Sequence, residues 1–258
     1  MQHLISSLKD GTPLVYAWFE AMHTRIDLML WDRGVGEDVI LELIRDIRED
    51  VLRIERMGSC FMTDSELSAV NRSPVGTPVE ISEELYSILS RCIEHNKATE
   101  GLFDIAVSRN SPGLRLDEKI LLEAGNKVMR LKEEVYINLS AYLKGYALDR
   151  AVAKVRNAHV ANGLISFGNS SIAAFGNHPN GEGWPVAAAQ GDENEYIICD
   201  MFLTSSGNET EDRIHIINPL TGEPVIGKGM VSVMSGTAEE GEVLSTVTFI
   251  KNNETKTT

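Results

Sequence analysis

Several short segments of the sequence carry groups that suit a proton transfer, a metal ion or a phosphate. In RIHIINPLTGEP, residues 213–224, His215 stands near the end of an alternating strand, just before an Asn-Pro turn. An imidazole titrates near neutrality and can move a proton. A lone histidine at a strand end is more often packed or solvated, so a functional role for His215 requires other site residues elsewhere in the chain.

The segment EEGEVLST, residues 239–246, opens a predicted helix and combines Glu242 with Thr246. A spacing of four residues puts both side chains on one helical face. A carboxylate and a hydroxyl are hard oxygen ligands that suit Mg²⁺. The alternative is an acidic first turn whose only role is to complement the helix dipole.

The segment LKGYALD, residues 143–149, places Gly145 in the first turn of another predicted helix. Free backbone N–H groups and the helix dipole at such a position suit a phosphate or the polar edge of a ligand. The alternative is a plain helix start with a solvated pair of Lys144 and Asp149.

The segment TSSGN, residues 204–208, sets the hydroxyls of Ser205 and Ser206 beside Gly207. A backbone with glycine can approach phosphate oxygens closely. A turn between two strands explains the same residues equally well, so this segment does not by itself define a site.

Composition limits the classes of function. The 258 residues suffice for one large domain or two intimate lobes. A formal net charge of −14 argues against a general binder of nucleic acid or anionic membranes, and acidic chains are natural hosts for Mg²⁺. Three cysteines without metal-type spacing suggest neither a disulfide framework nor zinc. Neither a signal peptide nor a membrane-spanning run is visible, so we expect a cytoplasmic chain without a membrane span.

Apolar periodicity predicts helices clustered in the N-terminal half and strands in the C-terminal half, which is an α+β class. We expect one domain over residues 1–258, with two lobes at about 13–110 and 125–250 and a cleft between them. Predicted helices cover 38–54 (with Val39 on its apolar stripe), 65–71 behind a capping box at 63–66, 82–101, 141–159 and 239–250, followed by a frayed tail at 251–258. Predicted strands cover 13–31 as a pair joined near 21–24, 103–107, 127–140 as a hairpin turning at 132–134, 163–168, 184–189, 195–203, 213–219 and 230–236.

Four segments now stand in a recognisable order. They are MGSCFMTDSELSAVNRS at 57–73, GLFDIAV at 101–107, INLSAYLKGYALDRA at 137–151, and the series LTSSGN, RIHIINPLTGEP and GEVLST. Their order and spacing resemble the ApbE family, flavin transferases that move FMN from FAD onto a Thr or Ser of a target protein using Mg²⁺. The resemblance runs from about Met22 to about Thr246 and implies an ApbE-like (T-fold-like) architecture with a mainly antiparallel sheet in the C-terminal half.

The resemblance also implies roles for individual residues. It places His215 in the active site, where it would take the proton of the incoming hydroxyl or hydrogen-bond a phosphate oxygen. It implies a Mg²⁺ site made by Glu242, Thr246 and a backbone carbonyl near Leu143. Its implied contacts to FAD, the substrate, are Met22, Phe103, Asp104, Lys144, Asp149, Ser205, Ser206 and Gly207.

The chain departs from the family pattern at several positions. Gly-Asn-Ser-Ser at 168–171 stands where the family has Gly-Gly-Asp, Asn218 and Glu242 replace aspartates, and His23 replaces a glycine. These departures leave two classes of function open, together with the oligomeric state and the identity of the target. One class is an enzyme that transfers FMN or hydrolyses FAD to FMN and AMP. The other is a non-catalytic member that binds a flavin or another nucleotide, or only a partner protein.

Overall fold

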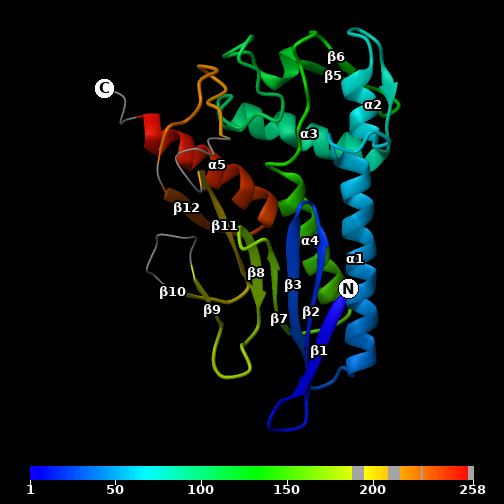
Figure 1. Ribbon diagram of the computed structural model, residues 1–258, viewed down its shortest axis with the longest axis vertical. Helices are drawn as coiled ribbons and strands as arrows, with labels where there is room; N and C mark the ends of the chain where they lie inside the picture. Colours follow the sequence, from blue (N-terminus) through cyan, green and yellow to red (C-terminus); the bar gives the residue numbers. More distant parts are fainter. Residues whose placement is uncertain (188–194, 209–215, 228, 255–258) are drawn as a thin grey trace. The chain divides into compact units, whose positions relative to one another are not determined.

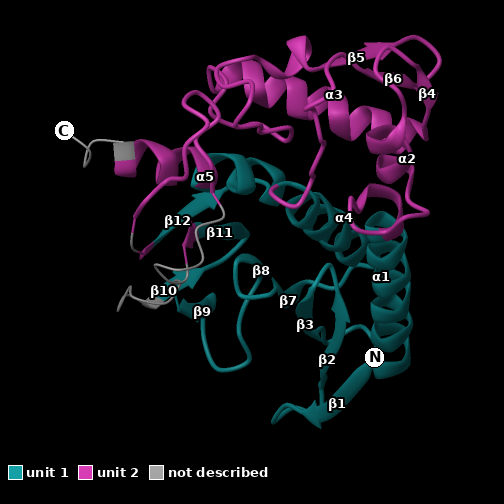
Figure 2. Ribbon diagram, turned by 45° about the horizontal axis from the view of Figure 1, so that its top comes forward, with its two compact units in different colours: residues 1–55, 142–206, 230–245 teal, residues 56–141, 207–229, 246–258 magenta. Residues whose placement is uncertain are grey.

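The computed structural model describes residues 1–187, 195–208, 216–227 and 229–254 (Figure 1). Two compact units make up the chain, and each is assembled from separate segments (Figure 2). Unit 1 comprises Met1–Glu55, Tyr142–Ser206 and Met230–Ser245, and unit 2 comprises Arg56–Ala141, Gly207–Gly229 and Thr246–Thr258. The two lobes expected from the sequence, and the cleft between them, stay a prediction.

Unit 1 is organised around a seven-stranded sheet with the strand order β1-β2-β3-β7-β8-β11-β12. The neighbouring pairs from β1 through β11 are antiparallel, which agrees with the expected mainly antiparallel sheet. The strands are β1 (Gln2–Ser7), β2 (Pro13–Ala21), β3 (Thr24–Trp31), β7 (Asn162–Phe167), β8 (Ser171–Phe175), β11 (Met201–Asn208) and β12 (Gly229–Ser235).

The predicted hairpin at 13–31 is confirmed as β2 and β3. Its alternation buries Val15 and Ala17 on one strand and Ile26 and Leu28 on the other, so one face of the sheet is apolar. Met22 and His23 form the turn with φ angles of 52° and 57°. Two consecutive positive φ values match the right-handed twist of the strands, as in a type I′ turn.

Two long helices of unit 1 are linked side by side by ion pairs. They are α1 (Glu37–Gly58) and α4 (Leu143–Asn157), and both were predicted from apolar periodicity. Arg150 donates to Asp50 at 2.9 Å and Lys154 to Asp46 at 2.7 Å, which ties α4 to α1. Val39 was expected on the apolar stripe of α1, but it is 52% exposed because the buried stripe begins one residue later.

The other face of the sheet is partly covered by the hairpin of β9 (Trp184–Ala187) and β10 (Glu195–Ile198). Trp184, Val186 and Ile198 pack with Ile172 and Leu203 of the sheet into an apolar cluster. The sequence predicted one strand over 195–203, but the chain breaks after Ile198 and resumes at Met201. The break contains Asp200 at φ 52°, a conformation that an extended strand does not accept.

Unit 2 contains α2 (Glu66–Arg72), α3 (Glu83–Ala98), the short η1 (Leu116–Glu118), and a three-stranded sheet ordered β4-β6-β5. Its strands are β4 (Val79–Glu80), β5 (Ile120–Glu123) and β6 (Lys127–Arg130). The hairpin expected over 127–140 is wrong, because β6 pairs with β4 and β5 instead. Residues 103–107, which the sequence predicted as a short strand or a tight extended piece, do not form a strand.

Helix caps follow the sequence in one case and not in another. The Ser82 hydroxyl accepts the Leu85 N–H at 3.3 Å and begins α3, as predicted. Ser65, rather than Thr63, caps α2 and accepts the Ser68 N–H at 2.9 Å.

The last helix, α5 (Ala238–Glu254), runs past the point where the sequence predicted fraying. Within the described ranges, no helix is long and apolar enough to cross a membrane.

Candidate functional site

Glu242 is the buried charge around which the candidate site of unit 1 is built. It lies in the second turn of α5 and is only 4% exposed. The Ser171 hydroxyl, from the first residue of β8, donates to Glu242 Oε1 at 2.5 Å. Burial raises the pKa of the Glu242 carboxyl, while the nearby Lys144 charge and the Ser171 hydrogen bond lower it in part.

Lys144, in the first turn of α4, supplies the positive charge near Glu242. Its side chain is half-buried, and Nζ donates to Ser170 Oγ at 2.6 Å. Among the described side chains, Lys144 and Glu242 form no direct ion pair, although the ammonium acts on the carboxylate through space. We call Lys144, Ser170, Ser171 and Glu242 the charged cluster.

Gly145 allows α4 to approach α5 closely. A Cβ at this position would lie 2.7 Å from the Ala238 carbonyl oxygen and 2.7 Å from Glu242 Cγ, so any side chain would displace the start of α5. The sequence suggested that the backbone here suits a phosphate or the polar edge of a ligand, and this stays a prediction. In the structure the glycine serves helix packing and leaves space for the Glu242 side chain.

Glu242 and Thr246 both lie on α5, one turn apart, and their predicted sharing of a metal ion stays a prediction. Thr246 is half-buried, and Leu143, the first residue of α4, is 6% exposed. No group of three or more His, Cys, Asp or Glu side chains suited to a metal occurs in the described part of the chain. In the predicted set of Glu242, Thr246 and the Leu143 carbonyl, Glu242 is the one carboxylate, so a divalent cation held by that set would also need ligands from outside the protein.

Asp149 connects α4 to the beginning of α5. Its two carboxylate oxygens accept the N–H groups of Ala238 at 2.8 Å and Glu239 at 2.9 Å. These backbone groups have no partner inside a helix, so the carboxylate caps α5 and complements its dipole. The structural role of Asp149 is to fix the helix that carries Glu242, and its contact with FAD stays a prediction.

The segment TSSGN lies within β11 rather than in a turn. Ser205 and Ser232 share a hydroxyl hydrogen bond of 2.9 Å, and Ser206 and Ser245 share one of 2.8 Å. These pairs connect β11 with β12 on one side and with α5 on the other. The turn alternative is thus wrong, and both hydroxyls are used within the fold.

The two turns at one end of the sheet are neighbours. Met22 N–H donates to Glu55 Oε1 of α1 at 2.8 Å. Gly168 and Asn169 form the turn between β7 and β8 with φ angles of 63° and 60°. A Cβ on Gly168 would lie 2.1 Å from Thr24 Oγ1, so glycine is required where the two turns meet. Met22 and the Gly-Asn-Ser-Ser segment are therefore brought to the same end of the sheet.

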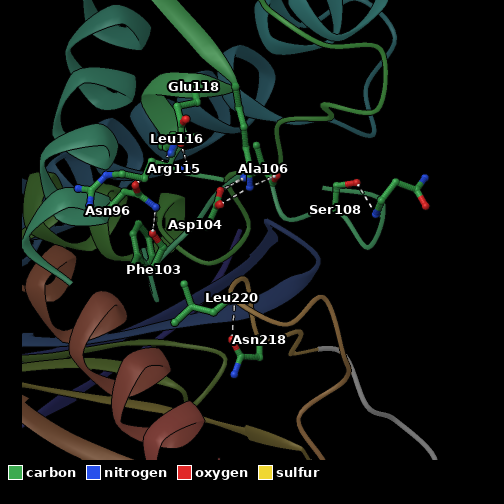
Figure 3. A network of polar contacts seen from close by, with 12 residues as sticks. Asn96, Phe103, Asp104, Ala106, Ser108, Arg115, Leu116, Glu118, Asn218 and Leu220 are labelled. Atoms are coloured by element: carbon green, nitrogen blue, oxygen red, sulfur yellow. Dashed lines mark hydrogen bonds and ion pairs between the residues drawn. The ribbon is translucent and has the colours of Figure 1, made fainter. Parts of the chain in front are cut away.

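Phe103 and Asp104, two of the predicted site residues of unit 2, lie in a buried polar network (Figure 3). Asp104 Oδ1 accepts the Ala106 N–H at 2.7 Å, and Lys119 Nζ donates to Asp104 Oδ2 at 2.5 Å and to the Ala106 carbonyl at 3.1 Å. The side chains of Lys119 and Asp104 are 1% and 0% exposed. Phe103 is equally buried and packs edge-on against His95. This ion pair fixes the loop after Phe103, and the flavin contacts of Phe103 and Asp104 stay predictions.

Asp104→Ala is expected to destabilise the protein by about 3–5 kcal/mol, because it leaves the Lys119 ammonium buried without its partner. The free energy of unfolding in urea measures this loss. The matched control is Asp117→Ala, which breaks the exposed ion pair with Lys97 and should cost no more than about 1 kcal/mol. Equal losses in the two variants would contradict a structural role for the buried pair.

His215 lies outside the described residues. The turn that follows it is described and agrees with the sequence: Asn218 Oδ1 accepts the Leu220 N–H at 2.9 Å, and the Gly222 N–H donates to the Asn218 carbonyl at 2.8 Å. Gly222 has a φ of 75°, as a turn glycine should. Asn218 thus acts here through its side-chain amide as a turn former.

The predicted site residues fall into two sets. Unit 1 holds Met22, Leu143, Lys144, Asp149, Ser205, Ser206 and Glu242, and unit 2 holds Phe103, Asp104, Gly207 and Thr246. Sequence reasoning did not identify Ser170, Ser171 and Lys119. The replacement of Gly-Gly-Asp by Gly-Asn-Ser-Ser was the available signal for the two serines, because it exchanges a carboxylate for hydroxyls.

A model of the ApbE family matches residues 22–257. The chain belongs to the ApbE family. Solved structures agree on the fold of this ApbE member: the flavin transferase ApbE from Vibrio cholerae matches with a TM-score of 0.78 at 20% identity, over 93% of this chain and 87% of that one. The ApbE protein from Thermotoga maritima matches with a TM-score of 0.78 at 23% identity, over 93% and 88%.

Curated relatives of this ApbE member carry the name FAD:protein FMN transferase. The protein from Haemophilus influenzae is 26% identical over 74% of this chain and 67% of its own length. The protein from Chlamydia pneumoniae is 28% identical over 62% of this chain and 60% of its own length. The chain thus spans about two thirds or less of the length of these relatives.

Proposed function

We propose that this ApbE member is a Mg²⁺-dependent FAD:protein FMN transferase. It would move FMN from FAD to a Thr or Ser hydroxyl of a target flavoprotein and release AMP. The observation that carries the proposal is the charged cluster, in which Glu242 is buried with one hydroxyl donor to its carboxylate in the described structure. The family match and the names of the curated relatives support the same activity.

By its chemistry, the donor set of Glu242, Thr246 and the Leu143 carbonyl suits a magnesium ion. A buried carboxylate whose direct partner is a neutral hydroxyl is short of compensating positive charge, and burial already raises the pKa of Glu242. Glu242, Thr246 and the carbonyl of Leu143 would hold the cation, with FAD phosphates completing the hard oxygen ligands that Mg²⁺ prefers. When bound, the cation supplies positive charge to the diphosphate.

At the phosphorus of the FMN half, the reaction exchanges the phosphoanhydride bond of the diphosphate for a phosphoester bond. The acceptor hydroxyl oxygen forms a bond to the phosphorus of the FMN half, and the bond from that phosphorus to the oxygen of AMP breaks. We propose that His215 accepts the proton of the acceptor hydroxyl as a general base, because an imidazole titrates near neutrality. Glu242 acts by holding positive charge against the diphosphate, which a chain of net charge −14 does not otherwise favour.

Covalent transfer to protein separates this activity from simple hydrolysis of FAD. The purified protein is incubated with FAD, Mg²⁺ and an apo-flavoprotein acceptor, and flavin fluorescence is read in a denaturing gel. We expect a fluorescent acceptor band that requires Mg²⁺ and is lost when the acceptor Thr or Ser is replaced by Ala. Free FMN and AMP without a labelled acceptor would instead identify an FAD pyrophosphatase.

A further inference from the structure

Two neighbouring serines of the charged cluster each hold one charged side chain. Ser170 Oγ accepts a hydrogen bond from Lys144 Nζ at 2.6 Å, and Ser171 Oγ donates one to Glu242 Oε1 at 2.5 Å. Lys144 comes from α4 and Glu242 from α5, while both serines stand where β7 turns into β8. The two opposite charges are thereby bound to adjacent residues, Ser170 in the turn and Ser171 at the start of β8, rather than to each other.

This separation needs a cause, because opposite charges attract strongly where solvent is excluded. Ser171 is fully buried and Glu242 nearly so, and the Lys144 charge already acts on the Glu242 carboxyl. A direct ion pair would neutralise the carboxylate and occupy one of its oxygens. The hydrogen bond to Ser170 gives the ammonium another partner, and the hydrogen bond to Ser171 fixes the direction of the carboxylate.

Gly145 also helps to position the Glu242 side chain, because it leaves space beside it. Gly145 follows Lys144 directly, and its missing side chain leaves room for Glu242 Cγ. Glutamate is longer than the aspartate of the family pattern by one methylene, so its carboxylate needs both room and an anchor. Gly145 provides the first and Ser171 provides the second.

We infer that Ser170 and Ser171 are positioning residues that keep the Glu242 carboxylate open for a divalent cation. Ser170 keeps the Lys144 ammonium from pairing directly with the Glu242 carboxylate, and Ser171 orients that carboxylate. The inference rests on the proposed function, which puts Mg²⁺ at Glu242. Outer-shell partners of this kind commonly change metal affinity by roughly 10- to 100-fold when they are removed.

The test measures metal binding rather than turnover. Mn²⁺, which shares the preference of Mg²⁺ for oxygen ligands, is titrated into the protein at saturating FAD, and the free ion is counted by its electron paramagnetic resonance signal. FAD affinity is measured separately by flavin fluorescence, and folding by thermal unfolding. The variants are Ser170→Ala, Ser171→Ala and the double variant Ser170→Ala with Lys144→Met. Ser87→Ala, at an exposed position of α3, is the control for the loss of a hydroxyl.

Ser170→Ala should weaken Mn²⁺ binding by roughly 10- to 100-fold, because the released ammonium pairs with Glu242. Removing that ammonium in the double variant should restore Mn²⁺ affinity to within about threefold of wild type, which is about 0.7 kcal/mol. Ser171→Ala should weaken Mn²⁺ binding to a similar extent, and Ser87→Ala should not change it.

Each contrary outcome has a distinct meaning. Wild-type affinity in both single variants, or a weakened Ser170→Ala that Lys144→Met does not restore, would overturn the inference while leaving the proposed function standing. If the wild-type protein itself binds FAD but no Mn²⁺, the proposed metal dependence fails and the inference fails with it.

Discussion

Glu242→Gln is expected to lower the rate of AMP release from FAD by about 10²–10³-fold, because a cation that stabilises developing charge is worth several kcal/mol. The substitution keeps the size of the side chain and its hydrogen bond with Ser171 but removes the negative charge that holds the cation. Steady-state AMP release at varied Mg²⁺ measures the effect. An unchanged rate and an unchanged Mg²⁺ dependence would remove Glu242 from the site.

Glu242→Gln is expected to lower the rate of AMP release without lowering the stability of the metal-free protein. The folded-state pKa of Glu242 is raised by burial, so the folded protein binds more protons than the unfolded chain between the ordinary pKa and the raised value. Stability of the metal-free protein therefore falls as pH rises through that window, and glutamine removes this contribution. In EDTA at neutral pH, Glu242→Gln should be at least as stable as wild type in urea unfolding. A large loss of stability would indicate a purely structural carboxylate.

His215→Ala is the second substitution with a large expected effect. If His215 takes the proton of the acceptor hydroxyl, the rate should fall by roughly 10²–10⁴-fold while FAD affinity changes only a few-fold. Turnover of the wild-type protein should also fall as pH drops through the titration of an unperturbed imidazole, near ~6.5. Rates of AMP release across pH, with FAD affinity from flavin fluorescence, separate the two effects.

A variant as active as wild type would exclude His215 from the proton transfer. If neither protein releases AMP and the substitution alters only FAD affinity, the chain belongs to the non-catalytic class. The control is Asn218→Ala, which removes the hydrogen bond to Leu220 in the turn after His215 without removing an imidazole.

Local pattern was sufficient to predict the elements whose interactions are mainly local. The apolar stripes predicted α1, α3 and α4, and the alternation of residues 13–31 predicted β2 and β3. The wrong predictions concern segments whose conformation depends on pairing with residues far away in the sequence or on a single backbone conformation. Residues 127–140 alternate like a hairpin, but β6 finds its partners in β4 and β5, and the break at Asp200 depends on a backbone conformation that the apolar run conceals.

The candidate site shows the same division. The spacing of Glu242 and Thr246 is a property of one helix and could be predicted from the sequence. The contact of Ser171 with Glu242 joins residues 71 positions apart, so no local pattern indicated it. Asp149 caps α5 by accepting backbone N–H groups 89 and 90 positions away, which no local pattern indicated, and its expected contact with FAD stays a prediction.

Release of AMP from FAD tests the proposed activity most directly. The wild-type protein is mixed with FAD and an apo-flavoprotein acceptor, with Mg²⁺ or with EDTA, and the nucleotides are separated by chromatography. We predict that AMP forms in equal amount to the FMN transferred, and only when Mg²⁺ is present. Retention of bound but intact FAD, with no AMP in the presence of Mg²⁺ and acceptor, would contradict the assignment of this ApbE member as a flavin transferase.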